Sequence, residues 1–197
     1  MPIAVTIRFR FYFLFGKFQF FFMSDTSNIE VRPATLRDAK AIAEIHVSAR
    51  QAAFKAVVPG EKLPPLSLEK SQAYWREAIE FAEPQVYVAL DEGRVVGFVG
   101  FDRSRDKGTP STTGEIWAIY VATTHWGQGV GLALWDAARE GLLEEGCTKV
   151  TVWLPLGDER ALRFHDLAGF KREMTSIKTV PMGTVRVEEI RMKRDLS

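Results

Sequence analysis

Three glycines at alternate positions distinguish the segment HWGQGVG, residues 125–131. The segment before it, 114–121, alternates like a strand, and the segment after it, 132–146, has the apolar spacing of a helix. The first turn of a helix has unpaired amides and the positive end of the helix dipole, and glycine lets that backbone come close to a ligand. The pattern predicts an anion site, most commonly filled by phosphate, with a tight turn that holds no ligand as the alternative.

Two common phosphate-binding motifs do not fit this loop. No Lys-Ser or Lys-Thr pair follows the last glycine, which excludes a Walker A motif. Leu132 stands where a dinucleotide fingerprint requires its third glycine, and the next strand, 149–154, has no acidic residue for a ribose. A different phosphate-bearing ligand is therefore expected.

Composition limits the class of protein. A chain of 197 residues with 46% hydrophobic residues can bury one full core, so a single domain is expected. A net charge of +1 argues against a broad nucleic-acid or membrane surface. The single cysteine, Cys147, excludes an internal disulfide framework, fits a cytoplasmic protein and is interpreted as a buried structural thiol.

Residues 1–22 differ from the rest of the chain because they hold eight of its 14 phenylalanines. Charged residues interrupt the apolar run, which is too short for a membrane span and unsuited to a secretory signal. We interpret 1–22 as a leader without function upstream of the true start at Met23. A targeting segment or an added aromatic contact are the alternatives.

The remaining sequence predicts a mixed sheet flanked by helices, with no second domain boundary. Thr35 and Asp38 form a capping-box pattern at the start of the first helix, and a β-bulge is expected near Glu188 and Glu189. The expected strands are 29–34, 85–90, 95–102, 114–121, 149–154 and two in the tail from 174 to 194. The expected helices are 35–54, 68–81, 132–146 and 158–169.

Three segments in this order resemble the GCN5-related N-acetyltransferase (GNAT) superfamily over residues 29–197. They are IEVRPATLRDAKAIAEIH at the front, IYV followed by WGQGVG in the middle, and DERALRFHDLAGF near the end. The resemblance implies a mostly antiparallel central sheet of α/β type, flanked by helices and splayed where acetyl-CoA binds. Residues 23–197 would form this domain.

The resemblance also implies which residues hold acetyl-CoA. Its pyrophosphate would lie on the loop amides, its pantetheine along the central strand, and the last helix would complete the site. The family has Arg or Gln at the first signature position, where this chain has Trp126, so one side-chain donor to phosphate is missing. The implied cofactor residues are Ile119, Tyr120, Val121, Trp126, Gly127, Gln128, Gly129, Val130, Gly131, Leu132, Asp158, Ala161 and Phe164.

Two residues are candidates for proton transfer. Glu115 resembles the glutamate that acts as general base in histone acetyltransferases of the superfamily, and the alternative is a strand-edge glutamate that faces solvent. His165 stands where the family often has a tyrosine acid, and helical spacing points it inward. The alternative for His165 is a buried histidine without a catalytic role. Asp158 replaces a family asparagine and is also a good helix N-cap.

The resulting expectation is an N-acetyltransferase that moves the acetyl group of acetyl-CoA directly to a primary amine of a small molecule or peptide in a ternary complex. The alternatives are an acyl-CoA-binding sensor of the same fold and a nucleotide-binding regulator. His46 and His125 are assigned structural roles, and three dispersed histidines predict no metal site. A monomer or homodimer without nucleic-acid or membrane partners is expected, with the acceptor against the first two helices, loop 55–67 and hairpin 181–183.

Overall fold

The computed structural model describes residues 29–58, 66–182 and 185–196. The leader interpretation of residues 1–22 therefore lies outside the described part of the chain. Seven strands form one sheet in the order β1-β2-β3-β4-β5-β7-β6. All neighbouring strands are antiparallel except β4 and β5, which confirms the predicted mostly antiparallel sheet.

The structure contains all seven predicted strands. Their bounds are β1 (Glu30–Pro33), β2 (Gln85–Asp91), β3 (Arg94–Arg103), β4 (Thr113–Val121), β5 (Lys149–Pro155), β6 (Lys171–Met182) and β7 (Val185–Asp195). The helices are α1 (Ala39–Val57), α2 (Leu68–Phe81), α3 (Val130–Glu144) and α4 (Glu159–Leu167), with single 3-10 turns η1 (Leu36–Asp38) and η2 (Thr123–His125).

Two apolar clusters place the helices on opposite faces of the sheet. One cluster joins α3 and α4 to residues of the sheet that include Phe101, Ile116 and Val152. The other joins α1 and α2 to the opposite face, with Trp75 packed against Phe98 at 4.7 Å between ring centroids. Cys147 is a buried free thiol in the first cluster, which confirms its structural interpretation.

The helix ends show which local signals were read correctly. The Asp38 carboxylate accepts a 2.7 Å hydrogen bond from the Thr35 amide, as the capping-box pattern predicts. α2 has the predicted bounds, and the Ser67 hydroxyl caps it by accepting from the Lys70 amide at 3.3 Å. α1 continues to Val57, three residues past its predicted end.

The predicted bulge in β7 is wrong. β7 stays in register with β5 through Ile190, and the irregularity lies in β6, where residues 174–177 have no partners in the ladder. In the sequence the apolar positions shift by one residue between Val187 and Ile190, which suggested a bulge. The structure shows instead that the two side chains lie on opposite faces of a regular strand and that both are buried.

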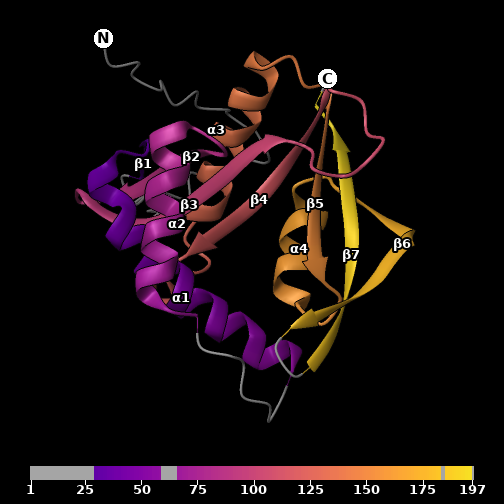
Figure 1. Cartoon of the computed structure of the whole chain (residues 1–197), viewed down its shortest axis with the longest axis horizontal. Coiled ribbons are helices and arrows are strands. Elements are labelled where there is room, and N and C mark those ends of the chain that lie inside the picture. Colours follow the sequence, from indigo (N-terminus) through magenta and orange to yellow (C-terminus); the bar gives the residue numbers. More distant parts are fainter. Residues whose placement is uncertain (1–28, 59–65, 183–184, 197) are drawn as a thin grey trace, which may run out of the picture.

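The sheet opens between β4 and β5, as the family resemblance implies. The two strands pair over only four positions, from Thr113 with Lys149 to Ile116 with Val152. Beyond Ile116 they separate, and Figure 1 shows them together at one end and spread apart at the other, with α4 behind the gap. Within the described ranges no helix is long and apolar enough to cross a membrane.

Candidate active site

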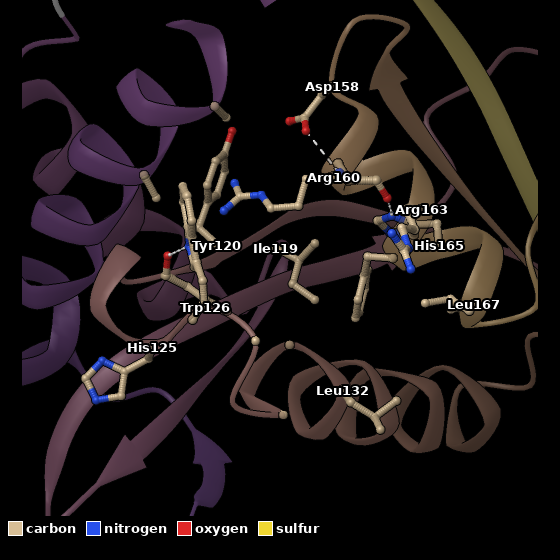
Figure 2. A pocket seen from close by; sticks show the side chains of 18 residues that line it. Ile119, Tyr120, His125, Trp126, Leu132, Asp158, Arg160, Arg163, His165 and Leu167 are labelled. Carbon is tan, nitrogen blue, oxygen red and sulfur yellow. Dashed lines mark hydrogen bonds between the residues drawn. The ribbon is translucent and has the colours of Figure 1, made fainter. Parts of the chain in front are cut away.

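A cavity of about 400 Å³ lies where β4 and β5 separate. Five parts of the chain line it: α1, the end of β4, the glycine loop, the first turn of α3, and α4 (Figure 2). The lining residues are Ala49, Ala53, Ile119, Tyr120, Val121, His125, Trp126, Gly127, Gly129, Gly131, Leu132, Asp158, Arg160, Ala161, Arg163, Phe164, His165 and Leu167.

The edge of β4 that faces this cavity has free hydrogen-bonding groups. The Ala122 amide donates to the Val96 carbonyl at 2.8 Å, and antiparallel ladders alternate, so every second residue of β4 bonds to β3. The backbone groups of Ile119 and Val121 therefore point away from β3, toward the gap. The Val121 carbonyl confirms this direction, because it accepts a 2.8 Å hydrogen bond from the Trp126 indole across the loop.

A β-bulge in β4 coincides with the point where β5 departs. Ala118 pairs with Gly100 and Ile116 pairs with Phe101, which leaves Trp117 as the extra residue. The bulge reverses the alternation, so Ile116 packs in the α3/α4 cluster whereas Ala118 and Tyr120 pack on the α1/α2 side. Ile119 and Val121 therefore present both their side chains and their free backbone groups to the cavity.

The glycine loop has the geometry of an anion site. Gly127 and Gly129 have φ angles of +76° and +84°, and a Cβ at either position would meet no atom within 4 Å. Gly129 is the N-cap of α3, and no side chain caps this helix or places an acid in its first turn. The amides of residues 130–132 consequently have no intrahelical partner. The helix starts two residues earlier than predicted because Gly129 ends the turn.

Two of the predicted cofactor residues do not line the cavity with their side chains. The Gln128 side-chain amide donates to the Thr124 carbonyl at 2.9 Å, and the Val130 side chain is buried in the core below the loop. A ligand could reach Val130 only through its backbone. The other eleven predicted cofactor residues line the cavity.

α4 closes the opposite wall. The Asp158 carboxylate accepts from the Ala161 amide at 3.0 Å, which confirms its role as helix N-cap. Gly169 ends the helix with a φ of +84°, and the Phe170 amide turns back to the His165 carbonyl at 2.9 Å. Phe164 lies against the start of α3, where a Cβ on Gly131 would be 3.3 Å from its ring.

Sequence reasoning missed Arg160 and Arg163, which both line the cavity from α4. The guanidinium carbon of Arg160 lies 3.1 Å from the centroid of the Trp126 ring. Burial lowers the pKa of Arg160, and the neighbouring Asp158 charge opposes that effect. One signal in the sequence could have identified Arg160, because it is a basic residue in the first turn of a helix expected to face the anion-binding loop.

His165 lies inside the cavity wall, as its helical phase predicts, and only 2% of it is exposed. Its Nδ1 is 2.9 Å from the Ala161 carbonyl, which can only accept, so Nδ1 carries the proton. Burial lowers the pKa of His165 and keeps the ring neutral. Its Nε2 is consequently a hydrogen-bond acceptor.

Glu115 lies outside the cavity, on the face of β4 that α3 and α4 do not cover. Its carboxylate accepts from the Arg105 amide at 2.9 Å and pairs with the Arg105 guanidinium, which lies 3.9 Å from the Trp117 ring centroid. Glu115 is 2% exposed, so the alternative of a glutamate that faces solvent is wrong. The structure does not bring Glu115 and His165 together in one pocket.

The two other histidines have clear local partners. His46 Nδ1 accepts from the Trp75 indole at 3.0 Å and lies 3.1 Å from the Ser71 hydroxyl. His125 lines the cavity, with its Nε2 3.3 Å from the Asp91 carboxylate. Across the described residues no group of three or more His, Cys, Asp and Glu side chains could hold a metal ion.

The buried His46 predicts a stability effect in mild acid. Burial lowers the pKa of His46 from 6.5 to about 4, so the unfolded chain takes up a proton before the folded one. Stability attributable to His46 is full above pH 6.5 and falls as the pH drops toward 4. Between pH 7.5 and 5, denaturant unfolding should show a loss about 2 kcal/mol smaller in His46→Gln than in the parent protein. Equal losses in both proteins would contradict this assignment.

A mostly antiparallel sheet that opens between β4 and β5, beside a glycine-rich helix start that no side chain caps, defines an α/β protein with a cavity at the opening. A sequence model of the acetyltransferase (GNAT) family matches residues 52–170, and the chain belongs to this family. The resemblance seen in the sequence is thereby confirmed.

Known relatives agree with this assignment. The uncharacterized N-acetyltransferase YuaI of Bacillus subtilis (strain 168) is 33% identical over 129 residues, which cover 64% of this chain and 71% of that protein. An N-acetyltransferase from Staphylococcus aureus Mu50 has a TM-score of 0.67 at 20% identity, over 87% of this chain and all of that one. The putative acetyltransferase yncA from Salmonella typhimurium, solved with acetyl-CoA, has a TM-score of 0.65 at 22% identity, over 86% and 94%. These structures share the fold.

Proposed function

We propose that the protein transfers the acetyl group of acetyl-CoA to a primary amine of a small molecule or peptide, by direct transfer in a ternary complex. The observation that carries this proposal is the open edge of β4 beside the uncapped start of α3. One ligand that combines a pyrophosphate with an arm of two amides and a thioester matches both features. The yncA structure with acetyl-CoA supports the same choice.

The backbone would provide most of the cofactor contacts. The unpaired amides at the start of α3 suit the pyrophosphate, because they donate hydrogen bonds along the positive end of the helix dipole. The groups of Ile119 and Val121 that face the gap suit the pantetheine amides, which would continue the sheet as a short added strand. Ala161 and Phe164 would cover the arm from α4.

The reaction needs a donor for the oxygen that becomes negative in the tetrahedral intermediate. The Ile119 amide points into the gap, and no strand within the described residues pairs with it there. We assign this amide to the thioester oxygen, since a fixed backbone donor needs no reorganisation during the reaction. The amine nitrogen then forms the new bond to the acetyl carbon and gives its proton to a general base, for which we propose Glu115. The bond to sulfur breaks, and the thiolate leaves.

His165 should contribute little to proton transfer. The thiol of CoA, taken as similar to cysteine with a pKa near 8.5, leaves as a stable anion, and its protonation at pH 7 contributes only about 2 kcal/mol. A neutral His165 whose Nδ1 proton is committed to Ala161 is better placed to accept a hydrogen bond than to act as an acid. We expect His165→Phe to lower turnover by less than about 30-fold at pH 7. A larger loss in a protein that still binds CoA would assign the acid role to His165.

The second candidate function is an acyl-CoA-binding sensor without turnover. It is favoured by the pairing of Glu115 with Arg105, which occupies the carboxylate proposed as base. Incubation with acetyl-CoA and a panel of primary amines separates the two functions when free thiol is followed with time. Amine-dependent thiol release supports the transferase. CoA binding without release from any amine supports the sensor.

A further inference from the structure

The cavity contains an arginine, Arg160, to which the proposed mechanism assigns no role. Arg160 extends from the first turn of α4 across the cavity and lies over the Trp126 ring (Figure 2). Its neighbour Asp158 directs its carboxylate to the Ala161 amide, and in the described part of the chain no acidic group forms an ion pair with Arg160.

The platform beneath Arg160 is itself fixed. The Trp126 indole donates to the Val121 carbonyl at 2.8 Å, which holds the ring at the end of β4. A guanidinium stacks well on an aromatic face and keeps its five N–H donors at its rim. Arg160 is therefore held between the glycine loop and α4 with its donors available to a ligand.

We propose that Arg160, held on Trp126, supplies the side-chain contact to the cofactor pyrophosphate that the glycine loop of this chain lacks. The inference rests on the proposed use of acetyl-CoA. Position 126 begins the loop signature, where a tryptophan cannot bind phosphate through a charged group. The guanidinium reaches the same end of the cavity from the opposite wall. Arg160 is a cofactor-binding residue, and Trp126 is a positioning residue that acts through it.

Comparison of two acetyl donors tests the contact. Acetyl-CoA carries the pyrophosphate, whereas acetylpantetheine has the same thioester arm and no phosphate. A charge-assisted hydrogen bond contributes about 1.5 to 3 kcal/mol, so Arg160→Gln should raise the KM for acetyl-CoA roughly 10- to 100-fold. The KM for acetylpantetheine should stay the same. Arg37→Gln is the control, because Arg37 is exposed in η1 outside the cavity and its loss changes the net charge equally.

Two further variants test the role of the ring. Trp126→Leu should raise the KM for acetyl-CoA, and adding Arg160→Gln to it should cause less additional change than Arg160→Gln causes alone. Trp126→Arg combined with Arg160→Gln should recover much of the lost affinity by placing the cation on the loop. Calorimetric binding of CoA to the same variants gives an independent readout without turnover.

The outcomes separate the two levels of the proposal. If Arg160→Gln changes both donors equally, or neither, the phosphate contact is wrong although acetyl-CoA is still the cofactor. If the parent protein binds neither CoA nor acetyl-CoA, the proposed function itself fails. A donor-specific loss that the Trp126→Arg variant restores supports the assignment.

Discussion

Gly129→Val should abolish the stabilisation of the protein by acetyl-CoA. Gly129 has a φ of +84°, a region that a β-branched residue rarely adopts, and its side chain would project where the phosphate approaches the start of α3. A ligand at 100 times its Kd stabilises a protein by about 2.7 kcal/mol, and this increment should disappear. Thermal unfolding with and without acetyl-CoA measures it.

The strain of the substitution must be separated from the loss of the site. Gly108 is the matched control, because its φ is +79°, a Cβ there would also meet no atom within 4 Å, and it does not line the cavity. Both valine variants should lose about 1 to 3 kcal/mol of stability through backbone strain. Only Gly108→Val should keep the acetyl-CoA increment. If Gly129→Val keeps it as well, the phosphate does not bind to this loop.

Glu115→Gln should lower turnover by about 10² to 10⁴ at pH 7 if Glu115 is the general base that we propose. An alkylamine with a pKa of about 10.4 is only about 0.04% neutral at pH 7, a deficit of about 4.6 kcal/mol that a base must help to overcome. The deficit of the variant should shrink as the pH rises toward the pKa of the amine, because the nucleophile then arrives neutral.

The ion pair supplies the control for this variant. Glu115→Gln and Arg105→Met both remove the pair between Arg105 and Glu115, but only the first removes the carboxylate. If Glu115 is the base, Arg105→Met retains most of the turnover and its pH profile. Parallel losses in the two variants would show that the pair only supports the fold, and the base would then be ordered water or another carboxylate.

Local sequence signals predicted most of the elements that build the site. The bounds of α2, the cap at Asp158, the inward phase of His165 and the glycine turn depend on interactions between residues close in sequence. Such signals are strong because the backbone geometry itself selects the residue type. The opening between β4 and β5 was predicted only from the family resemblance. No local sequence pattern shows where two neighbouring strands stop pairing.

Contacts between distant side chains could not be predicted in the same way. The stacking of Arg160 on Trp126 joins residues 34 positions apart, and it depends on how α4 sits over the loop. The partner of Glu115 comes from the connection after β3, a polar segment without periodicity. The irregular part of β6 could not be predicted either. The unpaired residues 174–177 interrupt only the ladder with β7, and β7 keeps a regular register with β5 on its other side.

The four-position contact between β4 and β5 also bears on how the protein avoids association with itself. A strand edge with free amides and carbonyls is a template on which another polypeptide can add a strand, and natural sheets protect such edges. Here the free edge of β4 is inside the sheet, because it faces the gap between β4 and β5, and α4 lies beside that gap (Figure 1). Residues of α4 line the same cavity as this edge, and covering an edge with a helix is one way in which natural sheets prevent the addition of a foreign strand. The fold thus keeps an edge available for a small molecule without offering it to the aggregation pathways that follow from exposed strands.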